Sequence, residues 1–109
     1  MFTIWEYEIV RIIKQSTLVK FATENPKAKP SLVRWIKLVK AAKWNSMNEL
    51  QVTVPGVVVL NGERARFEVA GGNFRLVASF SFKHQIVFIK FIGTHAEYDR
   101  IDALTVAMF

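Results

Sequence analysis

The alternation of apolar and polar residues near the start of the chain predicts a strand followed by a helix. Residues 7–13 (YEIVRII) have the composition and spacing of a strand. Ser16 is a suitable N-cap for a helix over residues 17–24, and Asn25-Pro26 is a suitable end for it. The first quarter of the chain is therefore expected to form one strand and one helix.

A second helix is predicted from Pro30 or Ser31 to about Ala42, because proline is well tolerated in the first helical turn. Apolar residues recur at helical spacing and should form its buried stripe: Leu32, Trp35, Ile36, Val39 and Ala42. Basic residues three apart lie on a different side of this helix: Arg34, Lys37, Lys40 and Lys43. Residues 46–50 are predicted to form another short turn of helix, and VTVPG then breaks the regular structure.

From residue 57 the pattern changes to a period of two, which predicts strands. The four apolar segments are VVVL, ARFEVA, FRLVASFSF and QIVFIKFI, and the predicted turns between them are Asn61-Gly62, Gly71-Gly72 and Lys83-His84. The last segment is apolar on both faces, which suits a central strand. Two helices followed by an antiparallel meander predict an α+β fold, with the helices packed on one face of the sheet.

Two-residue turns at Gly71-Gly72 and Lys83-His84 also predict which residues share a face of the sheet. Glu68 then lies opposite Arg75, Leu76 opposite Phe91, and Val77 opposite Lys90. The predicted core face consists of Phe67, Val69, Phe74, Leu76, Ile89 and Phe91. The other face collects Arg66, Glu68, Arg75, Val77 and Lys90, and the chain that leaves the last strand should emerge beside Arg75.

Length and composition limit the class of protein. The 109 residues fit one domain over residues 1–109, and 51% hydrophobic residues predict a folded globule. The absence of cysteine excludes disulfides, thiolate metal sites and a cysteine nucleophile. The acidic start MFTIWEYE does not fit a signal peptide, and the apolar runs are too short to span a bilayer. We therefore expect a soluble, cytoplasmic protein.

The net charge of +6 is concentrated in residues 1–50, where nine Lys and Arg face four Glu. This imbalance favours a polyanion or an acidic protein as a partner, although a merely solvated basic face explains it equally well. With two histidines and no HExxH pattern, the sequence predicts neither a metal site nor a cofactor.

The segment GTHAEYDRID, residues 93–102, has two interpretations. In the first, Thr94 and Glu97 form the capping box of a short C-terminal helix, and His95 is an exposed residue of the first turn without a special role. In the second, the helix N-terminus beside Arg75 is a phosphate site. Histidine is suited to proton transfer, arginine to bidentate contact with phosphate, and Tyr98 to stacking or proton transfer.

The stretches FEVAGGNFRLVASFSF and IVFIKFIGTHAEYDRID resemble the core of HigB-type toxins, mRNA interferases of the RelE/ParE toxin superfamily. The matching motifs are G-N-[FY]-R-L-V at residues 72–77, the run V-F-I-x-F-[IV]-G-T-H, and A-E-Y-D-x-I-D. Weaker similarity continues through residues 19–50. The resemblance implies a RelE-like fold, binding at the ribosomal A site, and cleavage of mRNA during translation. It also implies neutralisation by a HigA-like helix-turn-helix antitoxin, which alone would contact operator DNA.

When the family's catalytic positions are transferred to this sequence, the resemblance implies that Arg75, His95 and Tyr98 are catalytic. Asn73 also matches the family, in the motif at residues 72–77. Arg66 and Lys90 join the predicted RNA-binding set through the strand register instead. The resulting hypothesis is metal-independent transesterification, in which Arg75 stabilises the phosphorane charge and His95 acts as general acid or base. Two alternatives remain: a non-catalytic toxin that inhibits a protein target such as DNA gyrase, and a plain RNA-binding module.

Overall fold

The computed structural model describes residues 10–108, so residues 7–9 of the predicted first strand lie outside the described part. The described elements are, in order, β1 (Arg11–Ile13), α1 (Gln15–Glu24), a 3-10 helix (Pro26–Ala28), α2 (Lys29–Ala41), α3 (Met47–Thr53), β2 (Val58–Val59), β3 (Arg64–Val69), β4 (Phe74–Ser81), β5 (Ile86–Thr94) and α4 (His95–Tyr98). Within residues 10–108, no helix has the length and apolar character needed to cross a membrane.

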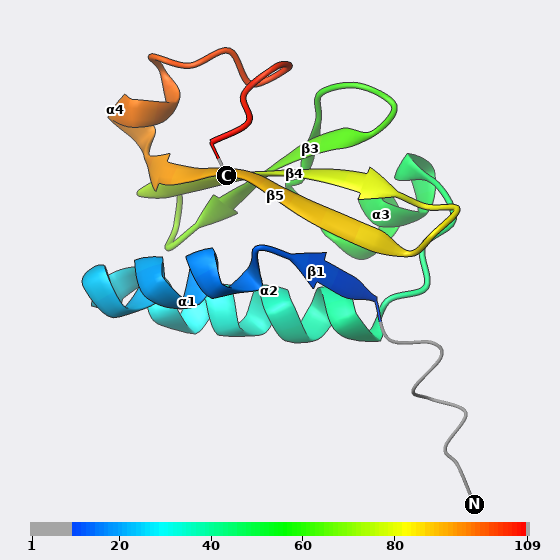
Figure 1. Ribbon diagram of the computed structural model, residues 1–109, viewed down its shortest axis with the longest axis horizontal. Helices are drawn as coiled ribbons and strands as arrows, with labels where there is room; N and C mark the ends of the chain where they lie inside the picture. Colours follow the sequence, from blue (N-terminus) through cyan, green and yellow to red (C-terminus); the bar gives the residue numbers. More distant parts are fainter. Residues whose placement is uncertain (1–9, 109) are drawn as a thin grey trace, which may run out of the picture.

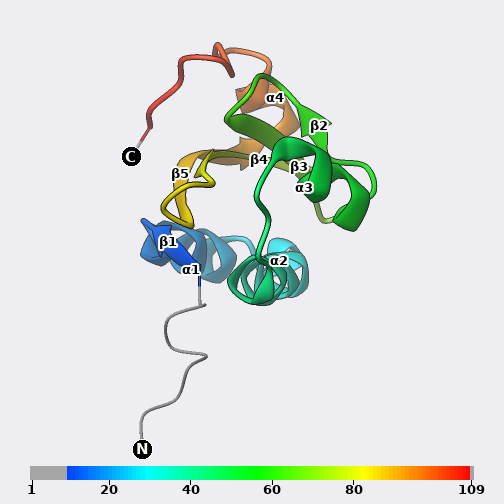
Figure 2. The same cartoon turned by 90° about the vertical axis from the view of Figure 1, so that its right-hand side faces the viewer.

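The five strands form one sheet in the order β1-β5-β4-β3-β2. Strands β2 to β5 pair antiparallel with their sequence neighbours, and β1 pairs in parallel with the start of β5. Figures 1 and 2 show α1 and α2 together beneath one face of the sheet, whereas α4 and the C-terminal residues lie on the opposite side. The predicted α+β fold, the meander and the inner position of β5 are confirmed.

Helix boundaries differ from the prediction mainly at the start of α1. Ser16 is not the N-cap, because the helix already begins at Gln15. Lys14 adopts a left-handed conformation with φ of 72°, and its carbonyl accepts a hydrogen bond from Thr17 N–H. This single residue turns the chain directly from β1 into the first helical turn, so the helix starts earlier than the capping rule indicates.

The later helices follow the prediction closely. Helix α2 begins at Lys29, with Pro30 in its first turn, and Ser46 caps α3 by accepting a hydrogen bond from Glu49 N–H. Helix α3 continues to Thr53 and so runs beyond the predicted turn.

The hydrophobic core lies between the two long helices and the sheet. The predicted stripe of α2 is confirmed, since Leu32, Trp35 and Val39 are buried and Ile36 and Ala42 pack partly buried against them. The Trp35 ring meets the Phe67 ring edge to face, with centroids 5.3 Å apart. Because each fully buried apolar side chain of this size contributes about 1.5–3 kcal/mol, this layer is the main source of stability.

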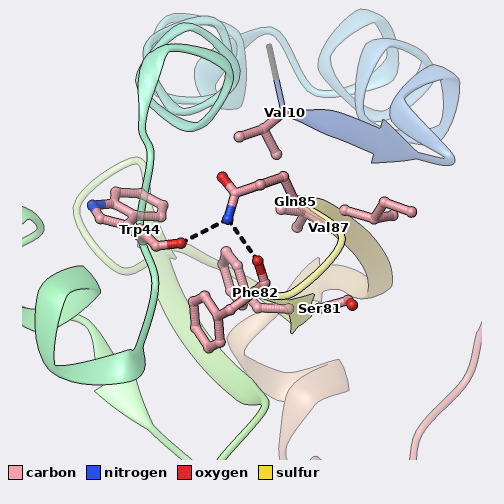
Figure 3. Close-up of a pocket in the computed structure, with 8 residues that line it drawn as sticks. Val10, Trp44, Ser81, Phe82, Gln85 and Val87 are labelled. Carbon is pink, nitrogen blue, oxygen red and sulfur yellow. Dashed lines mark hydrogen bonds between the residues drawn. The ribbon is translucent and has the colours of Figure 1, made fainter. Parts of the chain in front are cut away.

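The hairpin between β4 and β5 is joined to the chain that leaves α2. Gln85 Nε2 donates hydrogen bonds of 2.8 Å to the carbonyl oxygens of Trp44 and Phe82, as Figure 3 shows. The space there that can admit water is about 10 Å³, at or below the volume of one water molecule. This small cavity is therefore a packing feature between elements and does not form a ligand site.

The predicted register is confirmed between β3 and β4 and partly wrong between β4 and β5. Glu68 pairs with Arg75 as expected. Near the turn Ala78 pairs with Ile89, but Val77 pairs with Phe91, so Lys90 is an extra residue in β5. This β-bulge shifts every later residue of β5 by one position. Leu76 consequently faces Ile92, which takes the core position predicted for Phe91, and Lys90 does not face Val77.

The predicted two-residue turn at Asn61-Gly62 is also wrong in detail. Val59 pairs with Ala65, which leaves a longer loop between β2 and β3. The side-chain oxygen of Asn61 accepts hydrogen bonds from Glu63 N–H and Arg64 N–H at 2.9 and 2.7 Å. Asparagine therefore organises this turn through its side chain, and the turn is not of the tight hairpin type.

The junction between β5 and α4 depends on a glycine. Thr94 and Glu97 form the predicted capping box, with each side chain accepting a hydrogen bond from the other residue's N–H. A Cβ atom at Gly93 would lie 2.8 Å from Glu97 Oε1 and 2.8 Å from Phe91 Cζ. Phe91 is only 3% exposed, so its ring has no free space into which to move. The Glu97 side chain is exposed and can move, but only by giving up its cap hydrogen bond with Thr94 N–H.

We predict that Gly93→Ala lowers the free energy of unfolding by about 1–3 kcal/mol, because it overpacks this junction. Urea denaturation followed by circular dichroism measures the change. Gly62→Ala is the matched control, since a Cβ atom there meets nothing within 4 Å. Equal stability of both variants would show that the junction tolerates a methyl group.

Candidate active site

The sheet face opposite the helices carries a cluster of charged side chains from β3 and β4. The pairing of Glu68 with Arg75 and of Arg66 with Val77 places three of them together. Carboxylate oxygens of Glu68 lie 3.7 Å from Arg66 Nη2 and 3.2 Å from Arg75 Nε. The side chains of Arg66 and Arg75 are 20% and 15% exposed, so this cluster is shielded from water on most sides.

Tyr98 of α4 lies against both arginines. The centre of its ring is 5.3 Å from Arg66 Cζ and 4.9 Å from Arg75 Cζ, which are cation–π distances. Arg66 Nη1 also donates to the Tyr98 hydroxyl at 3.5 Å, and the Phe91 ring meets the tyrosine ring at an angle of 64°. The prediction that the chain beyond β5 emerges beside Arg75 is confirmed.

The cluster has an excess of positive charge. Two guanidinium groups face one carboxylate, and no other acid among residues 10–108 forms an ion pair with either arginine. The Nε atoms of Arg66 and Arg75 are buried and make no hydrogen bond, although Arg75 Nε is in ionic contact with Glu68. Such a site can bind a phosphate oxygen, and the low exposure strengthens that attraction relative to bulk water.

His95 lies at the exposed end of this site. It begins α4 three residues before Tyr98, its side chain is 52% exposed, and Nδ1 lies 3.3 Å from Asp99 Oδ2. The structure gives it no contact with either arginine. An exposed imidazole that is oriented by a carboxylate can still transfer a proton to a bound substrate.

The N-terminus of α4 is not an open phosphate site. His95 N–H donates to the Asn73 carbonyl at 3.3 Å, and Glu97 N–H donates to Thr94 Oγ1. The helix also spans only one turn. Anion binding on this face therefore depends on the arginine side chains rather than on backbone N–H groups.

Two of the predicted RNA-binding residues lie away from the arginine cluster. Asn73 is exposed in the β3–β4 turn, and its main chain binds Ala70 and His95. Lys90 occupies the bulge, where its Nζ atom lies 5.4 Å from the centre of the Phe88 ring. Neither side chain contacts Arg66, Arg75 or Tyr98 in the described part of the chain, so the part of Asn73 and Lys90 in RNA binding stays a prediction.

Sequence reasoning missed the part that Phe91 and Glu68 play. Phe91 was assigned to the core, but the bulge places it beneath Tyr98. Glu68 was located on the correct face without a role, although its spacing of two from Arg66 on a strand is a readable sign of an ion pair. Within the described part of the chain, no three His, Asp or Glu side chains gather closely enough to hold a metal ion.

Comparison with known proteins identifies the family of this chain. The chain is 23% identical over 94 residues to the mRNA interferase HigB of Escherichia coli O6:H1 (strain CFT073), and the alignment covers 84% of this chain and 91% of that protein. The sequence model of the HigB toxin family, described as the RelE-like toxic component of a toxin–antitoxin system, matches residues 28–101. That match spans most of the chain and contains the arginines and Tyr98, so the predicted resemblance is confirmed and the chain belongs to the HigB toxin family.

Proposed function

We propose that this toxin is an endoribonuclease that cleaves mRNA at the ribosomal A site by metal-independent transesterification. The observation that carries the proposal is the pair of shielded guanidinium groups held against Tyr98, which share one carboxylate and so keep an excess of positive charge for a phosphate. The name of the Escherichia coli relative, an mRNA interferase, supports the same substrate class.

The reaction requires no water and no external group. The 2′-oxygen of the RNA attacks the adjacent phosphorus, the bond from phosphorus to the 5′-oxygen breaks, and the products are a 2′,3′-cyclic phosphate and a 5′-hydroxyl. A base removes the proton of the 2′-hydroxyl, and an acid supplies a proton to the departing 5′-oxygen. Negative charge grows on the phosphorane oxygens in the transition state, which is where cations are most effective.

The position of each residue in the site determines its part in the reaction. Arg75 and Arg66 bind the phosphorane oxygens, and Tyr98 keeps the two guanidinium groups together through its ring. His95 transfers a proton from the exposed end of the site, with Asp99 orienting its ring.

Two residues at the edge of the site extend it along the RNA. Asn73 and Lys90 contact the flanking nucleotides from the β3–β4 turn and the bulge. Because both residues lie outside the arginine cluster, they are suited to a polymer that continues beyond the scissile phosphate.

The partners follow from the toxin–antitoxin class. A HigA-like antitoxin with a helix-turn-helix domain neutralises the toxin, and operator DNA is bound only through that antitoxin. The site of action is the cytoplasm, where the translating ribosomes are.

Arg75→Ala is expected to lower the rate of mRNA cleavage by about 10²–10³-fold, because it removes a donor to the phosphorane. The measurement is single-turnover cleavage of mRNA on translating ribosomes, with the new 5′ ends mapped. Lys83→Ala is the matched control, since it removes an exposed cation from the distant β4–β5 turn. A folded Arg75→Ala variant that cleaves within about twofold of the unchanged protein would contradict the assignment. Growth arrest without any cleavage would favour a toxin that inhibits a protein target.

Substitutions at Tyr98 separate its ring from its hydroxyl. We expect Tyr98→Phe to keep cleavage within about threefold, because the ring that holds the arginines is retained, and Tyr98→Ala to lose roughly tenfold or more. The same single-turnover assay measures both. Equal losses in the two variants would mean that the hydroxyl, and not the ring, carries the role of Tyr98.

A chemical test addresses the reaction itself. An mRNA with 2′-deoxyribose at the cleaved position should remain intact, because the attacking oxygen is missing. The unmodified mRNA should give a 2′,3′-cyclic phosphate end. Cleavage of the deoxy-substituted mRNA at the same position would rule out transesterification.

A further inference from the structure

Arg64 is a buried cation that the proposed mechanism does not use. It is 9% exposed, and no carboxylate among residues 10–108 forms an ion pair with it. Its Nη1 atom instead donates to the carbonyl oxygens of Ala103 at 3.0 Å and Val106 at 2.7 Å. Because a buried charge is costly unless its donors are satisfied, these two carbonyls determine where the guanidinium lies.

The main chain of Arg64 is fixed at the start of β3. Its N–H donates to the Asn61 side chain at 2.7 Å, and its carbonyl accepts from Leu60 N–H at 2.9 Å. The side chain therefore extends from an anchored position in the sheet to residues 39 and 42 places later in the sequence.

Residues 102–108 form what we call the C-terminal strap. Leu104 N–H donates to the Asp102 side chain, Val106 N–H donates to the Asp102 carbonyl, and Met108 N–H donates to the Lys90 carbonyl at 2.9 Å. Figure 1 shows the strap in red above the sheet, on the side away from α1 and α2. The strap is thus tied to β5 at its end and to β3 through Arg64.

The strap lies next to the residues that support the active site. Val106 and Met108 line one pocket together with Phe91 and Ile101, so these side chains are neighbours. Phe91 is 3% exposed and meets the Tyr98 ring with centroids 6.0 Å apart. The strap therefore lies beside Phe91, and Phe91 contacts Tyr98, which in turn contacts the two arginines.

We propose that Arg64 is a positioning residue that holds the C-terminal strap over Phe91 and thereby keeps Tyr98 against the two active-site arginines. The effect on cleavage rests on the proposed function, whereas the anchoring of the strap does not. Arg64 touches none of the reacting atoms in this scheme.

Arg64→Met tests the anchoring directly. Methionine replaces arginine with an unbranched apolar side chain that fills much of the same space, and it cannot donate the hydrogen bonds to the carbonyls of Ala103 and Val106. Hydrogen–deuterium exchange of residues 102–108 should become roughly tenfold faster or more, while exchange in β4 stays unchanged. Lys83→Met, which removes an exposed cation, should leave strap exchange as it was. Unchanged exchange in the Arg64→Met strap would overturn the proposal.

Steady-state kinetics then distinguish a positioning role of Arg64 from a general loss of folded protein. For Arg64→Met we expect kcat for mRNA cleavage to fall roughly tenfold with KM changed less than about twofold. Arg64→Lys, which can donate to one carbonyl, should recover part of the rate and part of the slow exchange. A loss of rate without faster strap exchange would show that Arg64 acts in another way.

Combining Arg64→Met with Asp102→Ala tests whether Arg64 acts through the strap. Asp102→Ala removes the side-chain acceptor inside the strap, so it should loosen the strap by a second route. If Arg64 acts through the strap, the two changes together should cost less in rate than the product of the separate losses. If the loss of rate in the double variant equals the product of the two separate losses, the proposal is overturned. If the unchanged protein does not cleave mRNA at all, the proposed function fails, and the exchange measurements still decide the role of the strap.

Discussion

The bulge at Lys90 is the constraint on which the working face of this protein depends. One extra residue in β5 places Ile92 in the core, turns Phe91 to the opposite face beneath Tyr98, and sets Gly93 beside Arg75. It also leaves the Lys90 carbonyl to accept the hydrogen bond from Met108. Bulges bend and redirect strands, and here the redirection connects the sheet, α4 and the strap.

The site keeps two cations close together because two different kinds of interaction offset their repulsion. Glu68 supplies one negative charge between Arg66 and Arg75, and the Tyr98 ring presents its electron-rich face to both. The remaining positive charge is therefore not neutralised within the described chain. In the proposed reaction, a phosphate at this cluster meets positive charge that is already in place, so little reorganisation is needed when charge develops.

The sequence predicted those parts of the fold that follow from local pattern. The stripe on α2, the capping box and the β3–β4 register each depend on residues close together in the chain, and all are confirmed. The bulge was not predictable, since β5 is apolar on both faces and a shift of one residue leaves its pattern equally plausible. The contacts of Arg64 with Ala103 and Val106 link distant segments, and no periodic signal in the sequence marks them.

The two faces of the sheet are held by different kinds of interaction, and this difference has a functional consequence. The helix face is closed by a large apolar core, whereas the opposite face is closed by Phe91 and by individual hydrogen bonds at Arg64, Lys90 and the capping box. Each such bond contributes only about 0.5–1.5 kcal/mol between neutral groups and about 1.5–3 kcal/mol where one group is charged. The strap and α4 can therefore open locally without unfolding the core. A ligand or partner that binds this face can control the position of Tyr98 while the fold stays intact.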